Sequence, residues 1–141
     1  MKKILIINSN YYKEISKNLI TAAKKKLIYA DYNINIIDVP GVYEIPIAIR
    51  KNIKRFDGFL ALGCVIKGQT PHFNLICSST FNALLNLSIN FNKPIGNGVI
   101  TALNLKQAKQ RSEKSNINKA NKGAEAANAV ISILTNEPRK I

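Results

Sequence analysis

Short apolar runs alternate along the chain with longer segments in which apolar residues recur every three or four positions. The first pattern is typical of strands and the second of amphipathic helices. The pattern predicts strands at residues 3–8, 32–39, 58–66 and 94–101. It predicts helices at residues 11–28, 44–54, 71–90, 105–111 and 122–135. Such regular alternation predicts an α/β fold with a four-stranded parallel sheet and helices on both of its faces.

The length of the chain restricts the architecture further. With 141 residues the chain can form one domain with a substantial core, so a single domain over residues 1–141 is expected. Four parallel strands in this length suit a small flavodoxin-like three-layer sandwich. No segment has the roughly 18 apolar residues that a membrane helix needs. The apolar run in MKKILIINSN is too short for a signal peptide and is better explained as the first strand, so the protein is expected to be cytoplasmic.

The segment FLALGCVIKGQTPHF, residues 59–73, contains the only histidine of the chain. Its apolar run up to Ile66 predicts a strand that is buried on both faces. Thr70 is expected to cap the next helix and Pro71 to occupy its first position, which places His72 in the first helical turn. Open α/β sheets bind ligands beyond the carboxyl ends of their strands. A lone histidine can equally be structural, but this position makes His72 a candidate catalytic residue.

Two other predicted strand ends lead into loops that would reach the same edge of the sheet, at residues 9–12 and 40–44. They carry the aromatic ring of Tyr11 and the carboxylate of Glu44. A hydrophobic staple would also explain Tyr11, and the helix dipole would also favour an acid at Glu44. Together with His72, these loops would form a pocket for a planar polar ring with a hydroxylated tail.

The start of the helix at residues 71–90 is also a candidate anion site. The backbone N–H groups of Gln69 and Thr70 would be free there, and the helix dipole favours negative charge. A guanidinium would complete such a site, and the spacing alone does not choose between Arg111, Arg50 and Arg55.

The two cysteines and the single histidine argue against several other sites. Cys64 and Cys77 are too few for a disulfide framework, and with one histidine they offer no ligand set for zinc. Both are expected to be small core residues. The glycine-rich fingerprints of dinucleotide and nucleoside triphosphate sites are absent, so neither kind of site is indicated.

The formal net charge of +13 suggests a nucleic-acid partner. However, the lysines are dispersed along the chain, and aromatic residues do not alternate with them as a stacking surface would require. The chain is also rich in asparagine and isoleucine, which share A/T-rich codons with lysine. Genome composition therefore explains the charge more simply, and no nucleic-acid partner is expected.

Three motifs, VPGVYEIP (39–46), LGCVIKGQTPHF (62–73) and NKGAEAA (121–127), resemble the lumazine synthase family in order and spacing. The resemblance covers essentially the whole chain. It implies condensation of 5-amino-6-(D-ribitylamino)uracil with 3,4-dihydroxy-2-butanone 4-phosphate to 6,7-dimethyl-8-ribityllumazine, with no cofactor and no metal. Alternatives are an archaeal-type riboflavin synthase of the same fold, which dismutates two lumazines, and a non-catalytic lumazine-binding protein.

The resemblance also implies the residues that bind the ribitylaminouracil. Tyr11 matches an aromatic ring that stacks on the pyrimidine, and Glu44 accepts hydrogen bonds from ribityl hydroxyls. The remaining positions in this group are Val42, Tyr43, Cys64, Val65, Ile66 and Asn97. Asn97 departs from the family pattern, which often has phenylalanine from a neighbouring subunit at this position.

For the phosphate, the resemblance implies binding by Gln69, Thr70 and Arg111, with His72 as the proton-transfer residue. Lys122 and Glu125 match charged residues near the site.

The resemblance further implies a homopentamer, either alone or paired into a decamer. A larger shell is not expected, because the first strand begins at about residue 3 and the stretch SEKSNINKA (112–120) is longer than the usual turn of the family.

Overall fold

The computed structural model describes residues 1–113 and 121–136. Its strands are β1 (Lys3–Ser9), β2 (Asn33–Val39), β3 (Gly58–Ile66) and β4 (Ile95–Ala102). Its α-helices are α1 (Lys13–Tyr29), α2 (Ile45–Asn52), α3 (His72–Phe91), α4 (Leu105–Gln110) and α5 (Lys122–Asn136). A 3₁₀ turn, η1 (Val42–Glu44), precedes α2. Most of the stretch SEKSNINKA lies outside the described residues.

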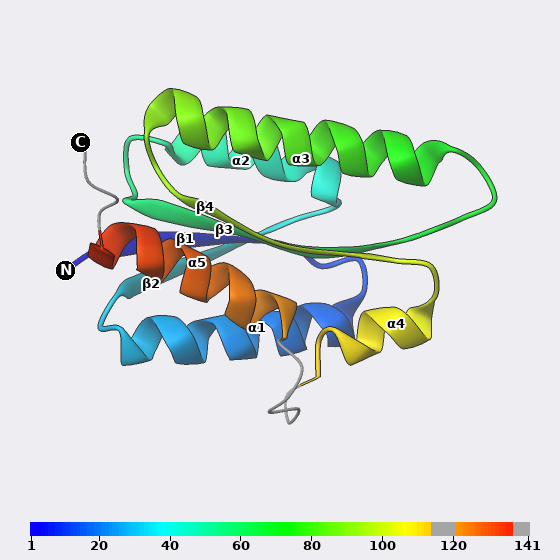
Figure 1. Ribbon diagram of the computed structural model, residues 1–141, viewed down its shortest axis with the longest axis horizontal. Coiled ribbons are helices and arrows are strands. Elements are labelled where there is room, and N and C mark those ends of the chain that lie inside the picture. The colour runs from blue at the N-terminus through cyan, green and yellow to red at the C-terminus, as the bar shows by residue number, and fades with distance from the viewer. Residues whose placement is uncertain (114–120, 137–141) are drawn as a thin grey trace.

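The strands form one parallel sheet in the order β2-β1-β3-β4. In Figure 1, α2 and α3 cover one face of the sheet, while α1, α4 and α5 lie on the other face. This arrangement confirms the predicted flavodoxin-like three-layer sandwich. It follows from the alternation of strands and helices, because each crossover between parallel strands needs a helix that packs back on the sheet.

The core lies on both faces of the central strands. In β1, Ile4 and Ile6 pack toward α1 and α5, whereas Leu5 and Ile7 pack toward α2 and α3. This two-sided burial explains why β1 and β3 have continuous apolar runs. By contrast, β2 lies at the edge of the sheet and exposes much of its length, including Ile36 and Ile37.

The start of α3 differs from the prediction. The Leu75 N–H donates to the Pro71 carbonyl at 3.2 Å, so Pro71 and not Thr70 occupies the N-cap position. The Thr70 hydroxyl accepts only a long hydrogen bond, 3.4 Å, from the His72 N–H. Thr70 stays outside the helix because a following proline disfavours helical backbone angles. The helix therefore begins at His72.

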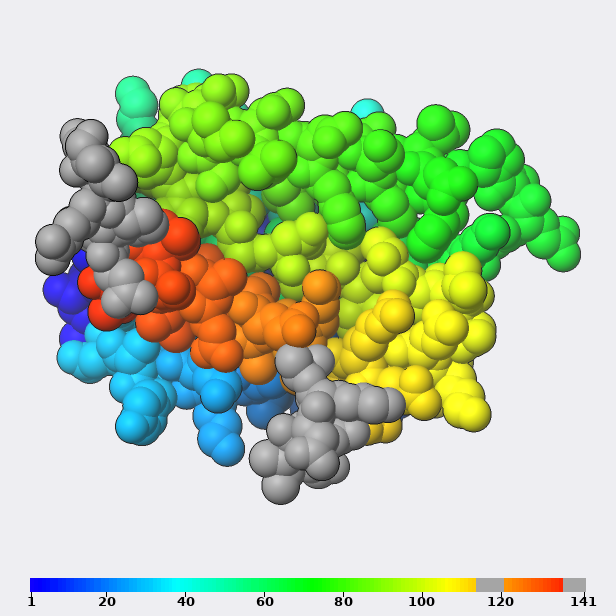
Figure 2. All heavy atoms as spheres, in the orientation of Figure 1, coloured from blue at the N-terminus to red at the C-terminus, as the bar shows by residue number. Residues whose placement is uncertain are grey.

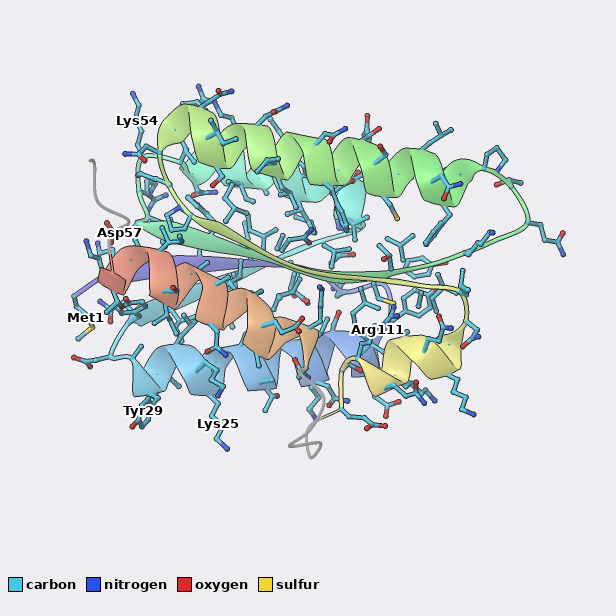
Figure 3. The ribbon with its side chains drawn as sticks, viewed as in Figure 1. Met1, Lys25, Tyr29, Lys54, Asp57 and Arg111 are labelled. Carbon is cyan, nitrogen blue, oxygen red and sulfur yellow. The ribbon has the colours of Figure 1, made fainter. Side chains whose placement is uncertain are left out.

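Basic side chains are spread over the surface. Lys25 on α1 and Lys54 after α2 point away from opposite sides of the molecule (Figure 3). Lys122 and Glu125, 3.5 Å apart, form the only ion pair within residues 1–113 and 121–136. No helix in these ranges is both long and apolar enough to cross a membrane.

Candidate active site

The loops that follow β1, β2 and β3 lie together at the carboxyl edge of the sheet. The Asn10 N–H donates to the Val39 carbonyl at 3.4 Å, which joins the first loop to the end of β2. The Lys67 N–H donates to the Ala102 carbonyl at 2.9 Å, which joins the third loop to the end of β4. All of the predicted strand-end loops thus surround one edge, where this kind of fold binds ligands.

Gly63 in β3 allows the first two loops to approach the sheet closely. A Cβ at this position would lie 2.8 Å from Val42 Cγ1 and 2.9 Å from Ser9 Cβ. No side chain could fit there without moving both loops. Val42 is itself buried and packs with the core residues of α2. Its side chain is therefore a packing group, and a substrate can reach Val42 mainly through the backbone.

Tyr43 and Glu44 lie beside a hollow of about 370 Å³ between α2 and α3. The Glu44 N–H donates to the Gly41 carbonyl at 3.2 Å, which closes η1 into a tight turn. Tyr43 is largely exposed. The buried hydroxyl of Thr80, which also lines the hollow, has no hydrogen-bond partner among the described residues. The carboxylate of Glu44 therefore lies beside a recess that could take a polar chain.

Tyr11 lies in the loop between β1 and α1, and its side chain is 74% exposed. The hydrophobic staple considered from the sequence is therefore wrong, because a staple would bury this ring against the helix. The ring instead contacts Tyr12 edge-to-face. Most of the Tyr11 ring remains free to contact a ligand.

The predicted phosphate-binding segment projects from one end of the molecule, as the green segment that leads into α3 in Figure 2 shows. Gln69, Thr70 and His72 are all exposed there. Within the described chain, the backbone N–H groups of Gln69 and Thr70 donate no hydrogen bond, and the His72 imidazole has no partner. These groups are available to an anion and to a proton transfer.

The structure distinguishes the three arginines that the sequence left open. Arg111 Nη1 donates to the Thr101 carbonyl at 2.7 Å, close to the carboxyl end of β4 and opposite Val65 (Figure 3). Arg50 instead stacks on Phe91, with its guanidinium carbon 4.7 Å from the ring centroid.

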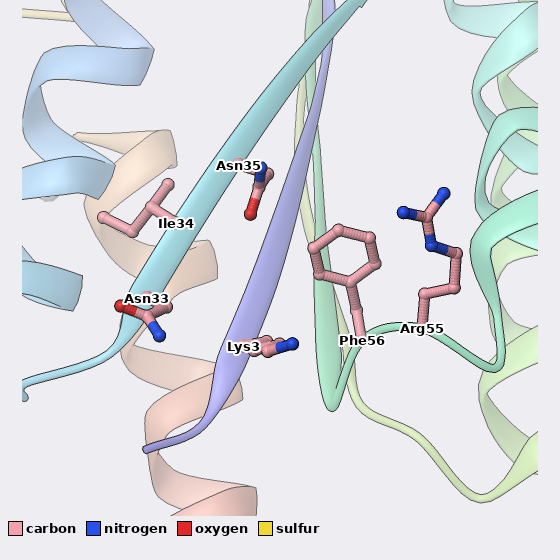
Figure 4. Close-up of a pocket in the computed structure, with 6 residues that line it drawn as sticks. All are labelled: Lys3, Asn33, Ile34, Asn35, Arg55 and Phe56. Atoms are coloured by element: carbon pink, nitrogen blue, oxygen red, sulfur yellow. The ribbon is translucent and has the colours of Figure 1, made fainter.

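Arg55 lies at the opposite, amino edge of the sheet. It lines a hollow of about 350 Å³ there with Lys3, Asn33, Ile34, Asn35 and Phe56 (Figure 4). None of the other predicted site residues lines this hollow. Arg111 is therefore the arginine that accompanies the strand-end loops.

Asn121 holds the start of α5 beside Arg111, and the sequence analysis missed it. Its Oδ1 accepts hydrogen bonds from the N–H groups of Gly123 at 2.8 Å and Ala124 at 3.2 Å. The Lys122 N–H donates to the Arg111 carbonyl at 2.8 Å. An asparagine directly before a helical segment is a recognisable N-cap signal, so this role could have been predicted.

Cys64, Val65 and Ile66 form the end of β3 at the site. Burial raises the pKa of the Cys64 thiol to about 11, so the group is protonated near neutral pH. Cys64 is buried, as predicted, whereas Cys77 on α3 is only partly buried. Within the two described ranges, no three His, Cys, Asp or Glu side chains gather in a way that could hold a metal ion.

Asn97 is not grouped with these loops, whereas Lys122 and its ion-pair partner Glu125 lie at the start of α5, next to Arg111. Asn97 lies opposite Ala61 in the middle of the sheet, and its Oδ1 accepts a hydrogen bond from the Val99 N–H at 3.1 Å. Within one chain, Asn97 is therefore several residues away from the carboxyl edge.

The fold and the strand-end loops define an α/β protein with a candidate ligand site at the carboxyl edge of a parallel sheet. The model of the 6,7-dimethyl-8-ribityllumazine synthase family matches residues 1–137. A protein of that name from Bartonella henselae is 40% identical over 134 residues, covering 92% of this chain and 86% of its own length. Another from Limosilactobacillus reuteri is 36% identical over 113 residues, covering 78% and 74%. The chain belongs to the 6,7-dimethyl-8-ribityllumazine synthase family.

Proposed function

We propose that the chain condenses 5-amino-6-(D-ribitylamino)uracil with 3,4-dihydroxy-2-butanone 4-phosphate to form 6,7-dimethyl-8-ribityllumazine, phosphate and water. The observation that carries the proposal is the family match over residues 1–137. The gathering of an aromatic ring, a carboxylate, an imidazole and a guanidinium at one sheet edge agrees with it.

The pyrimidine substrate is assigned to the first three strand-end loops. Its ring stacks on Tyr11 and contacts the backbone from Cys64 to Ile66. The ribityl chain lies toward η1, where Glu44 accepts hydrogen bonds from its hydroxyls, with Val42 and Tyr43 beside it. This assignment is supported by the exposure of Tyr11 and by the recess beside Glu44.

The four-carbon substrate is assigned to the start of α3. Its phosphate accepts hydrogen bonds from the free N–H groups of Gln69 and Thr70, and Arg111 supplies a charge-assisted partner. The 20-residue helix directs its positive dipole end toward this point. Lys122, beside Arg111, adds positive charge, and Glu125 orients Lys122 through their ion pair.

The reaction needs proton transfers more than a covalent nucleophile. An amine of the pyrimidine adds to the ketone, and water leaves as the imine forms. Phosphate is then eliminated, and the second amine attacks the remaining carbonyl and closes the ring with loss of a second water. His72 moves protons in these steps, since an imidazole has one nitrogen that can accept a proton and another that can donate one. Holding the two substrates together provides much of the remaining acceleration. The protonated Cys64 takes no part as a nucleophile.

We also propose that the active assembly is a homopentamer, alone or paired into a decamer. In one chain Tyr11, Tyr43 and the segment at residues 69–72 are exposed, and Asn97 lies away from them in the middle of β4. Asn97 would join the site only from a neighbouring copy. Exposed apolar side chains on α2 and α3, namely Ile47, Leu75, Leu85 and Ile89, support association.

The proposal assigns no nucleic-acid partner to the chain. The opposite placement of Lys25 and Lys54 supports this, because binding to a duplex needs basic groups on one face.

Two incubations of the purified protein test the proposed function against the riboflavin synthase alternative. With both substrates, mass spectrometry should detect 6,7-dimethyl-8-ribityllumazine. With that lumazine alone, no riboflavin should form. Riboflavin in the second incubation would favour the alternative, and no product in either would favour a non-catalytic binding protein.

A further inference from the structure

Tyr11 and Tyr12 are neighbours in the sequence but have different surroundings. Tyr11 is exposed, whereas Tyr12 is partly buried and packs against the core cluster under α1 and α5. The same cluster contains Cys64, at the end of β3. Tyr12 therefore joins the candidate substrate platform to the core.

The backbone of Tyr12 is fixed by the first turn of α1. Tyr12 occupies the N-cap position, and its carbonyl accepts a hydrogen bond from the Ser16 N–H at 2.9 Å. The buried Ser16 hydroxyl in turn donates to the Ser9 carbonyl at 2.7 Å. These two bonds tie the N-cap of α1 to the last residue of β1, so the position of Tyr12 relative to the sheet is well defined.

The ring of Tyr12 contacts the ring of Tyr11 directly. The two centroids lie 5.0 Å apart, and the planes meet at 73°, which is the favoured edge-to-face geometry. Burial raises the pKa of the Tyr12 phenol, and the nearby Cys64 and Tyr11 raise it further. The Tyr12 side chain thus lies close enough to Cys64, at the end of β3, and to Tyr11 for both groups to affect its pKa.

We propose that Tyr12 is a positioning residue that orients the Tyr11 ring for stacking on the pyrimidine substrate. An exposed tyrosine would otherwise sample several side-chain rotamers and would lose that freedom when the substrate binds. Contact with a ring that is held by the core reduces this loss before binding. The inference rests on the proposed function, because it requires Tyr11 to bind the pyrimidine.

Steady-state kinetics of Tyr12→Leu and Tyr12→Phe test the proposal. Leucine keeps apolar packing but removes the ring edge, so KM for the ribitylaminouracil should rise about two- to tenfold, the range expected for one aromatic pair. The KM for the butanone phosphate and kcat should change little. Phenylalanine keeps the ring and should retain the wild-type KM. Tyr29→Leu, at the far end of α1 and 94% exposed, is the control and should change neither KM.

A double variant shows whether Tyr12 acts through Tyr11. Tyr11→Leu combined with Tyr12→Leu should have the same KM as Tyr11→Leu alone, because the second change then has no ring left to orient. Additive effects would overturn the proposal, as would an equal rise of both substrate KM values. If Tyr12→Leu does not fold, Tyr12→Met keeps a longer apolar side chain on the core and takes its place in both experiments.

The same variants distinguish a wrong placement of the pyrimidine on Tyr11 from a wrong positioning role for Tyr12. If Tyr11→Leu leaves the ribitylaminouracil KM unchanged, the placement of the pyrimidine on Tyr11 is wrong. If Tyr11→Leu raises this KM but neither Tyr12→Leu nor Tyr12→Met does, only the positioning role of Tyr12 is wrong.

Discussion

His72 is exposed at the start of α3, and its imidazole is free of partners within the described ranges. Because we assign proton transfer to it, His72→Ala should lower kcat by about 10²- to 10⁴-fold and change both KM values much less. Asn74→Ala, another exposed substitution on α3, is the matched control and should have wild-type kinetics. An unchanged kcat in the His72 variant would remove His72 from the mechanism.

Arg111 leads to a second residue-scale prediction, which concerns only one substrate. Arg111→Ala should raise KM for the butanone phosphate about 10- to 100-fold, because a charge-assisted hydrogen bond to phosphate is lost. Arg111→Lys should recover part of the loss, since lysine keeps the charge but lacks the planar fork. Arg55→Ala, at the amino edge, should have no effect. A selective rise in the ribitylaminouracil KM would show that Arg111 is assigned to the wrong substrate.

At the scale of single residues, the sequence was sufficient to predict which residue types lie at the carboxyl edge of the sheet. The reason is that the loops following parallel strands all lie at this edge. The sequence could not choose Arg111 over Arg50 and Arg55. That choice depends on the positions in space of the residues at the ends of α2 and α4, which the sequence alone does not give. It also missed Tyr12, because two adjacent tyrosines look alike until one is packed on the core and the other is exposed.

At the scale of single elements, the start of α5 depends on the cap at Asn121. Asn121→Ala removes the acceptor for the N–H groups of Gly123 and Ala124, so the free energy of unfolding should fall by about 0.5–2 kcal/mol. Asn128→Ala, at an exposed position within α5, is the control and should leave stability nearly unchanged or slightly higher.

Urea unfolding of both variants at one fixed protein concentration makes the comparison, because assembly also contributes to stability. Equal stability of the two variants would mean that the cap is not needed to hold α5 next to Arg111.

Element boundaries were predictable where the local chemistry is unambiguous. The bounds of β3 agree with the prediction because glycine precedes an apolar run and Lys67-Gly68 follows it. The start of α3 was misplaced by one residue because Thr70-Pro71 carries a cap signal that the backbone does not use. The 3₁₀ turn η1 was not predicted. Val42, its first residue, lies against Gly63 of β3, and a contact between segments so far apart in the sequence leaves no local signal.

At the scale of the whole molecule, the parallel sheet and its two helical layers follow from the alternating pattern and right-handed crossovers. The strand order β2-β1-β3-β4 was not predicted, because right-handed crossovers are compatible with several orders. Assembly does not follow from one chain in the same way, because the surfaces that would meet are simply exposed apolar and polar residues.

Light scattering coupled to size exclusion should give five or ten times the mass of one chain. A monomer with full activity, or a particle of megadalton size, would contradict the proposed ring.

The central claim, that this chain joins the two substrates with loss of phosphate, is tested most directly in a single reaction mixture. Purified protein is given both substrates, inorganic phosphate is followed by ³¹P NMR, and the lumazine is followed by its absorbance. We predict that phosphate and 6,7-dimethyl-8-ribityllumazine appear in equal amounts and that omitting either substrate abolishes the lumazine. Phosphate release without lumazine, or no enzyme-dependent formation of either product, would contradict the account.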